Sequence, residues 1–157
     1  MEPSFEKLLV HLIGDEVDFI VVGELAVTLN GYVRLTEDVD ILVDLSPESL
    51  TRLIDSLGRF GEGFGGKMKP ADITPEPGAV RIIEESEQCQ VDIFSCLDGL
   101  FYNDFIDGAE TSTVGGKLFR YASKSQLIRF KSSSVREKDR LDVSALEQLI
   151  ENPRAFD

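Results

Sequence analysis

Asp38 and Asp40 stand one residue apart at the start of a run of branched apolar residues, 39–43. The side chains of an extended chain alternate between its two faces, so both carboxylates point to the same side. Two like charges at this spacing are unfavourable unless a cation lies between them. Because Mg²⁺ prefers oxygen ligands, the pattern predicts a magnesium site.

An isolated pair of acids is also typical of a solvated strand edge, where charges prevent pairing with another sheet. A third acid, Asp92, favours the metal site, since it lies in a second short β-rich run, residues 90–94. We expect the three carboxylates to lie within about 4–6 Å of one another and to bind Mg²⁺ or Mn²⁺. A third acid that points elsewhere, or that an arginine holds so that no vacancy for an ion is left, would rule this site out. The regular ligand spacing of a helix-loop-helix calcium site is missing.

Length and charge limit the classes of function. The 157 residues, 42% of them hydrophobic, predict a single domain over residues 1–157 with its own core. A net charge of −13 opposes binding to duplex nucleic acid and to anionic lipid. There is no cationic leader and no apolar run that could span a membrane, so we expect a cytoplasmic protein.

The chain contains few cysteine and histidine residues, which limits catalysis or metal binding by these side chains. Cys89 and Cys96 are the only cysteines, and their spacing matches neither a zinc site nor a redox pair, so we expect packing residues. His11 is the single histidine and lies on the apolar side of a predicted helix. Any site must therefore be built from carboxylates, lysines and arginines.

The apolar periodicity predicts the elements that position these residues. Helices are expected after caps at Ser4, Ser46 and Ser123, with others over about 25–30 and 136–150, and a short one near 101–105. Strands are expected at 19–22, 39–43, 79–83 and 90–94, with a last strand pair within 111–121. This order predicts the α+β class: a small mixed or antiparallel sheet with helices packed on it, including helices at the C-terminus.

Two connections carry distinctive composition. Residues 58–78 are rich in Gly and Pro, which predicts a mobile loop or a long connection. They lack the Gly-Lys-Ser/Thr ending of a phosphate-binding loop. Glu84, Glu85 and Glu87 lie between two predicted strands and are expected to form the solvated tip of a hairpin.

Taken together, residues 21–26, residues 31–43 and Asp92 resemble the nucleotidyltransferase superfamily that shares its fold with DNA polymerase beta. More narrowly, the chain is similar to small bacterial and archaeal members related to toxins of abortive-infection systems. The family pattern is a strand, a glycine turn, a helix, a Gly-x-x-Arg-x-Thr-x-Asp-x-Asp run and a third Asp on a neighbouring strand. Residues 127–131 and 136–142 also resemble the helical tail of the family, in which a Lys and a Lys-Asp pair recur.

The resemblance implies Mg²⁺-dependent transfer of a nucleoside monophosphate from a nucleoside triphosphate to a hydroxyl of a small molecule, a protein or an RNA end. Asp38 and Asp40 would hold Mg²⁺ against the triphosphate. Asp92 would hold a second ion or act as the base for the attacking hydroxyl. The backbone at Gly23, which begins a helix, would approach a phosphate.

Cations near the leaving pyrophosphate are implied in the same way. Lys131 or Lys138 would neutralise it, and Arg34 would share that work. The residues themselves leave alternatives open: Lys131 could be a solvated helix charge, and Lys138 could pair along its own helix. Thr36 could cap the turn before Asp38 through its hydroxyl, and Arg34 could pair with Asp38 when no metal is bound.

Glu24 departs from the family pattern, which has a small residue after the glycine. Its carboxylate could turn to solvent, interact with the helix dipole or supply another metal oxygen. It could also mean that triphosphate binding has been lost. The chain would then be a catalytically degenerate binding module that pairs with another protein, within a toxin and antitoxin system or as a homodimer.

Overall fold

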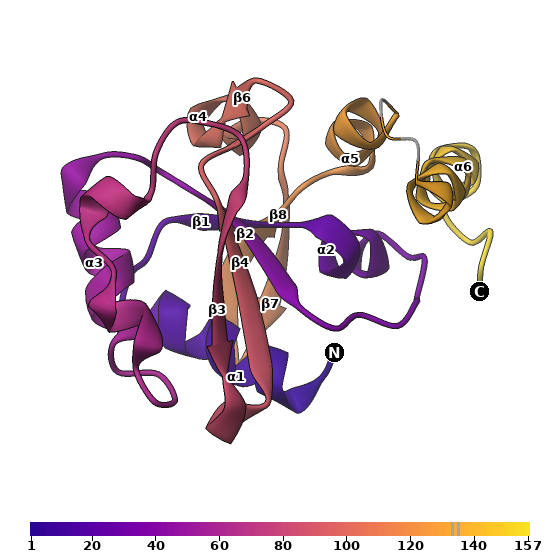
Figure 1. The fold of residues 1–157 in the computed structure, drawn as a ribbon. Coiled ribbons are helices and arrows are strands. Elements are labelled where there is room, and N and C mark those ends of the chain that lie inside the picture. The colour runs from indigo at the N-terminus through magenta and orange to yellow at the C-terminus, as the bar shows by residue number, and fades with distance from the viewer. Residues whose placement is uncertain (133, 135) are drawn as a thin grey trace.

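The computed structural model describes residues 1–132, 134 and 136–157. Its centre is a six-stranded sheet in the order β3-β4-β2-β1-β8-β7 (Figure 1). The strands are β1 (Phe19–Val22), β2 (Val39–Val43), β3 (Ala79–Glu84), β4 (Cys89–Phe94), β7 (Glu110–Val114) and β8 (Lys117–Tyr121). The short strands β5 (Cys96–Leu97) and β6 (Leu100–Phe101) form a separate pair. The pairs β1–β8 and β2–β4 are parallel and the other neighbours antiparallel, which confirms the predicted mixed sheet.

Helices lie on both sides of this sheet, and α3 and α6 are on opposite sides of it (Figure 1). The helices are α1 (Pro3–Gly14), α2 (Gly23–Leu29), α3 (Pro47–Leu57), α4 (Tyr102–Ile106), α5 (Lys124–Lys131) and α6 (Glu137–Glu151). The side chains of Ser46 and Ser123 cap α3 and α5 as predicted. The predicted cap at Ser4 is wrong, because Pro3 occupies the first turn and the N-cap position falls on Glu2.

The alternation of side chains along the central strands decides what each face of the sheet carries. Val39, Ile41 and Val43 are buried, and Leu8, Leu9 and Leu12 of α1 are fully buried in the same core cluster, as follows from their helical spacing. Asp40 lies between Val39 and Ile41 and therefore faces the other side of the sheet. That second face carries the candidate site.

The hairpin of β3 and β4 differs from its prediction at the tip. Glu84 is buried, and its carboxylate accepts hydrogen bonds from the backbone N–H groups of Glu62 at 2.8 Å and Phe64 at 2.9 Å. The expectation of a solvated tip is therefore wrong for Glu84, because its carboxylate binds the backbone of the connection over residues 58–78. Glu85 is exposed as expected, and Glu87 is half-buried and paired with Lys7.

The connection over residues 58–78 is long, as predicted, and contains two short 3-10 helices, η1 (Phe64–Lys67) and η2 (Pro70–Asp72). Cys89 and Cys96 are buried free thiols, which confirms their interpretation as packing residues. Burial raises the pKa of the Cys89 thiol to about 11, so this thiol is unreactive. Among the described residues, no helix combines the length and the apolar character needed to cross a membrane.

Candidate active site and metal centre

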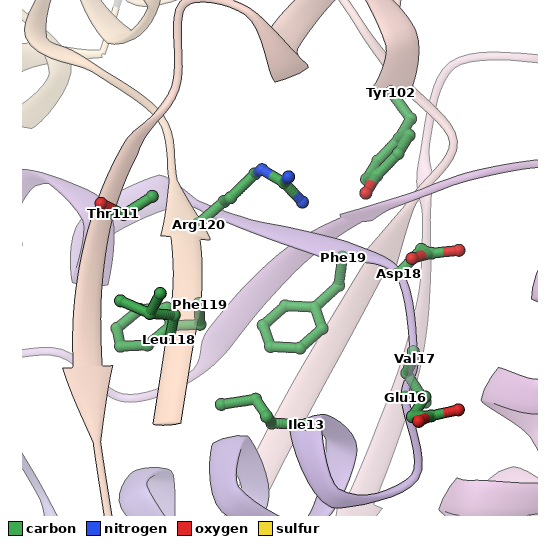
Figure 2. A pocket seen from close by; sticks show the side chains of 10 residues that line it. All are labelled: Ile13, Glu16, Val17, Asp18, Phe19, Tyr102, Thr111, Leu118, Phe119 and Arg120. Atoms are coloured by element: carbon green, nitrogen blue, oxygen red, sulfur yellow. The ribbon is translucent and has the colours of Figure 1, made fainter. Parts of the chain in front are cut away.

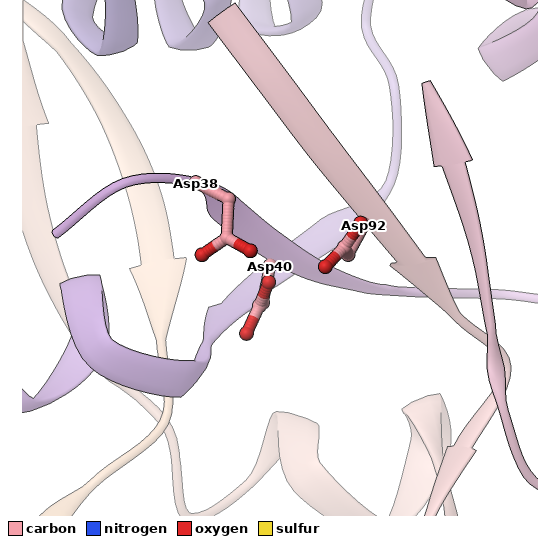
Figure 3. Close-up of side chains that lie close together, drawn as sticks. All are labelled: Asp38, Asp40 and Asp92. Atoms are coloured by element: carbon pink, nitrogen blue, oxygen red, sulfur yellow. The ribbon is translucent and has the colours of Figure 1, made fainter. Parts of the chain in front are cut away.

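Two adjacent parallel strands bring the three aspartates together. β2 pairs with β4 so that Asp40 lies directly beside Asp92, and Asp38 immediately precedes β2. Figure 3 shows the three side chains directed toward one another from these two segments. One carboxylate oxygen from each lies within 4.8 Å of the others. This separation agrees with the one expected from the sequence, because partners in neighbouring strands share a face.

The charged form of Asp40 is disfavoured in this arrangement. Burial raises the pKa of Asp40 to about 7, and the nearby charges of Asp38, Asp92 and Glu24 add to the effect. The Oδ1 atom of Asp40 is buried and has no hydrogen-bond partner among the described residues. Burial and the charge of Asp92 also raise the pKa of Asp38. A cation between these carboxylates would remove the repulsion and satisfy the free oxygen.

Gly23 explains why the backbone can pass so close to this carboxylate. Val22 pairs with Asp40, and the next residue, Gly23, has a φ of 70°. A Cβ at this position would collide with the Asp40 carboxylate. Glycine is therefore required at this position for two reasons: the backbone is in the left-handed region, and there is no room for a Cβ.

A cavity of about 270 Å³ opens between Asp40, the one member of the triad that lines it, and residues of the C-terminal helices α5 and α6. Its lining includes three of the residues singled out from the sequence, Gly23, Asp40 and Lys131, which come from different parts of the chain. The other lining residues are Val22, Phe94, Leu97, Phe130, Ser134, Arg136 and Asp139. The fold therefore brings these three residues, singled out separately in the sequence, to one cavity.

Lys131 is a buried charge and not a solvated one. Its side chain is 6% exposed, and its Nζ donates to Asp139 Oδ1 at 2.9 Å and lies 3.2 Å from Asp142 Oδ2. The alternative that Lys131 is a solvated helix charge is wrong, because α6 packs over this part of α5 and places the carboxylates of Asp139 and Asp142 against the lysine. Desolvation opposes the charge of Asp139, but hydrogen bonds from Lys131 and Ser134 outweigh it and hold the pKa of Asp139 at about 2.

A second group of charges surrounds Glu24 and joins α2 to α6. The Nζ of Lys138 donates to Glu24 Oε1 at 2.8 Å, and Nη2 of Arg34 lies 3.7 Å from the same oxygen. Arg34 also donates to the buried carboxylate of Asp142. Glu24 thus faces two cations from the chain and does not turn to solvent.

These pairs exclude two of the alternatives considered for the same residues. Arg34 pairs with Asp142 and Glu24, so the alternative of a pair with Asp38 is wrong. Lys138 reaches across to α2 instead of pairing along α6. The hydroxyl of Thr36 donates to the Arg34 carbonyl at 3.4 Å, which agrees with a turn-shaping role.

Sequence reasoning missed Arg81, which binds Asp92 through two hydrogen bonds of 2.9 and 3.1 Å. An arginine that holds the third acid and leaves no vacancy was expected to rule the metal site out. Arg81 holds Asp92, but the buried Oδ1 of Asp40 has no hydrogen-bond partner among the described residues. A signal for the Arg81 contact was present, because antiparallel strands over 79–83 and 90–94 place Arg81 opposite Asp92. Arg136 and Ser134 were also missed as site residues. Arg136 lies at the N-cap of α6, where the sequence predicted the helix to begin, and Ser134 precedes it.

Another cavity, of about 390 Å³, lies at the opposite end of β1. Figure 2 shows that the guanidinium of Arg120 and the hydroxyl of Tyr102 come from different elements around it. It is lined by Ile13, Glu16, Val17, Asp18, Phe19, Tyr102, Thr111, Leu118, Phe119 and Arg120. None of the residues singled out for nucleotide chemistry lies in it.

Comparison with solved structures identifies the fold. The lincosamide antibiotic adenylyltransferase LnuA, solved with lincomycin bound, matches with a TM-score of 0.62 and 20% identity over 94% of this chain and 96% of that chain. An antigenic nucleotidyltransferase-like protein from Paracoccidioides brasiliensis matches with a TM-score of 0.56 and 17% identity over 92% of this chain and 73% of that chain. No protein-family model and no curated sequence matches. At these identities the likeness establishes a nucleotidyltransferase fold, as the sequence resemblance predicted.

Proposed function

We propose that a protein with this fold and this triad is a nucleotidyltransferase, which uses Mg²⁺ or Mn²⁺ to move a nucleoside monophosphate from a nucleoside triphosphate to a hydroxyl group. The observation that carries the proposal is the convergence of Asp38, Asp40 and Asp92 within 4.8 Å. The adjoining cavity adds Lys131 and Arg136, two cations that Asp139 holds by ion pairs of 2.9 and 3.0 Å and whose charge suits a polyphosphate. Transfer of a nucleotidyl group needs carboxylates that bind the metal ion and cations that face the phosphates in one place.

The residues present fit a divalent cation. Carboxylate oxygens are the ligands that Mg²⁺ and Mn²⁺ favour, and the buried Oδ1 of Asp40 lacks a hydrogen-bond partner among the described residues. Asp38, Asp40 and Asp92 would together hold one ion or share two. Bound ions would polarise the phosphoryl oxygens and stabilise the charge that develops on the leaving group.

The side chains of the triad and its surroundings would carry out the proton transfer and the binding of the phosphates. The acceptor oxygen forms a bond to the α-phosphorus, the bond from that phosphorus to the bridging oxygen breaks, and pyrophosphate leaves with the electron pair. Asp92 would accept the proton of the attacking hydroxyl. Lys131 and Arg136 would face the phosphates, and Gly23 would keep the space beside Asp40 open.

Four further residues singled out from the sequence would act indirectly. Glu24, Lys138 and Arg34 would hold α6 against α2, and with it the wall of the cavity to which Arg136 belongs. Thr36 would fix the turn that leads into Asp38. The carboxylate of Glu24 would then be a structural anchor whose charge is balanced before any nucleotide binds.

The test is a transfer assay with purified protein, Mg²⁺ or Mn²⁺, and each α-labelled nucleoside triphosphate. The acceptors should include small hydroxyl compounds, RNA ends and the protein itself, and lincomycin belongs among them because the similar solved structure binds it. We expect labelled product and pyrophosphate release. Asp40→Asn should reduce the rate more than about a hundredfold, since loss of even an outer-shell partner costs about 10–100-fold.

Asp55→Asn is the matched control, because it removes an exposed carboxylate on α3 and should leave the rate unchanged. A wild-type rate in the Asp40→Asn variant would contradict the proposal.

A second candidate is a binding module that keeps this fold without transfer and pairs with a protein partner, as in a toxin and antitoxin system. The observation that favours it is Glu24, a carboxylate next to Gly23 where a triphosphate would lie. A nucleotide-binding measurement separates the two candidates. Tight, metal-dependent binding of a triphosphate supports the enzyme, whereas no binding in the wild type and recovered binding in Glu24→Gly supports the module.

A further inference from the structure

Arg81 places a permanent positive charge against the triad. Its Nε donates to Asp92 Oδ1 at 2.9 Å and its Nη2 donates to Asp92 Oδ2 at 3.1 Å. The same Nη2 lies 4.0 Å from Asp38 Oδ2. A guanidinium keeps its charge in proteins and matches a carboxylate with two parallel hydrogen bonds. Two of the three candidate metal ligands therefore already face a cation that belongs to the chain.

The two partners differ in their freedom to move. Arg81 and Asp92 are directly opposed in the β3–β4 pair, and β3 is an edge strand of the sheet. The side chain of Arg81 is 58% exposed, whereas that of Asp92 is 9% exposed. The guanidinium can therefore turn into solvent without disturbing the ladder of the sheet, while Asp92 stays between its neighbours.

Asp38 has a smaller, neutral partner on the same strand as Asp92. The Nε2 of Gln90 donates to Asp38 Oδ2 at 3.1 Å, so this carboxylate keeps a hydrogen bond if Arg81 leaves. Asp40 receives no bond from Arg81, and its Oδ1 has no hydrogen-bond partner among the described residues. The contact of Arg81 is thus concentrated on Asp92, the third ligand of the proposed metal centre.

We propose that Arg81 is an internal competitor for the metal site, an inference that rests on the proposed function. Without a bound divalent cation, its guanidinium neutralises Asp92. When a divalent cation binds, the two positive charges repel at this distance and the guanidinium moves to solvent. Arg81 therefore lowers the affinity of the triad for metal.

The test is a titration of nucleotide-free protein with Mn²⁺ alone, in which the free ion is quantified by its electron paramagnetic resonance signal. In Arg81→Gln we expect Mn²⁺ to bind about three- to tenfold more tightly than in the wild type, the range expected for loss of a competing charge-assisted pair. Arg59→Gln is the matched control: Arg59 is 59% exposed and paired with Asp15 at 2.8 Å, and its loss changes the net charge equally. Its Mn²⁺ affinity should equal that of the wild type.

The possible results separate this inference from the proposed function. If the wild type binds Mn²⁺ and Arg81→Gln binds it equally or more weakly, the competitor role of Arg81 is contradicted. The proposed metal site is then still supported. Equal tightening in Arg81→Gln and Arg59→Gln overturns the competitor role too, because the effect would then be one of net charge. If neither the wild type nor Arg81→Gln binds Mn²⁺ while both unfold cooperatively, the result contradicts both the proposed metal site and the competitor role of Arg81.

Discussion

Asp40 combines a raised pKa with a buried carboxylate oxygen that has no hydrogen-bond partner among the described residues. Such a group costs folding free energy when it is ionised, and binding sites commonly keep groups of this kind because the ligand relieves the cost. Gly23 is the complementary residue, since it leaves the space that lets the chain pass beside Asp40. At the scale of single residues, the ionised carboxylate of Asp40 is thus unfavourable by itself, and the proposed cation would relieve its cost.

This electrostatic cost gives the metal-free protein a defined pH dependence. The pKa of Asp40 rises from 3.8 in the unfolded chain to about 7 in the folded one, so its contribution to stability is present below pH 4 and is lost as the pH rises to 7. Asp40→Asn removes this loss. We expect the variant to exceed the wild type by about 2–4 kcal/mol in free energy of unfolding at pH 8, and to match it near pH 4.

The measurement is urea denaturation in the presence of a chelator at both pH values. Equal stability of the two proteins at pH 8 would show that Asp40 is not held in an unfavourable charged state.

Gly23→Ala should damage both stability and transfer. Gly116 provides a matched control, because its φ is 77° but a Cβ there would meet nothing within 4 Å. We expect Gly116→Ala to cost about 1 kcal/mol through the backbone alone, and Gly23→Ala to cost clearly more because the new methyl group meets Asp40. Thermal denaturation measures both costs. The excess should decrease when Asp40→Ala is added, because the nearest atoms, Oδ2 and Cγ, are removed and only the Cβ of residue 40, at 2.9 Å, remains. An excess that does not decrease would place the conflict elsewhere.

At the scale of elements, two strands supply the acids and two helices supply the cations. β2 and β4 are parallel neighbours, and α5 and α6 pack against each other through buried charges as well as apolar residues. Lys131 on α5 is held by Asp139 and Asp142 on α6. The cavity wall opposite the triad therefore depends on how α6 is seated.

Lys131→Met should destabilise the protein by about 3 kcal/mol, because it leaves the buried carboxylates of Asp139 and Asp142 without one of their cations. Lys138→Met is the matched control. It also removes one lysine charge from a pair with a carboxylate, but its side chain is 46% exposed, so the cost should stay below about 1 kcal/mol. Chemical denaturation of both variants distinguishes them, and equal costs would mean that the Lys131 pairs contribute no more than a surface pair.

At the scale of the whole molecule, the net charge of −13 makes divalent cations stabilising ligands. A specific site must be separated from this general attraction. Three acids within 4.8 Å on two central strands would bind an ion only in the folded chain, so binding would add directly to the stability of the fold.

We expect Mn²⁺ at a hundred times its dissociation constant to stabilise the wild type by about 2.7 kcal/mol. Asp40→Asn should lose this gain, whereas Asp55→Asn, which removes an exposed charge on α3, should keep it. The midpoint of thermal unfolding as a function of Mn²⁺ concentration checks both. An equal shift in all three proteins would indicate nonspecific screening of the negative surface.

Local patterns were enough to predict much of this molecule. The alternation of side chains over residues 39–43 predicted that Asp38 and Asp40 share one face, because strand geometry repeats every two residues. The family resemblance placed Asp92 on a neighbouring strand, and the parallel pairing of β2 with β4 brings it beside Asp40. The caps at Ser46 and Ser123 and the hairpin of β3 and β4 follow from equally short-range rules, whereas the cap predicted at Ser4 is wrong. These rules act over a few residues, so sequence alone carries them.

Charge pairing was decided only by the tertiary structure. Glu24 meets Lys138 and Arg34 meets Asp142 across more than 100 positions of sequence, and no periodicity links them. The burial of Lys131 likewise depends on where α6 packs. An ion pair requires proximity in space and a shared dielectric environment, which exist only after distant elements have come together. The sequence determined which strand face each aspartate occupies, and the tertiary pairing of β2 with β4 decided that these faces adjoin.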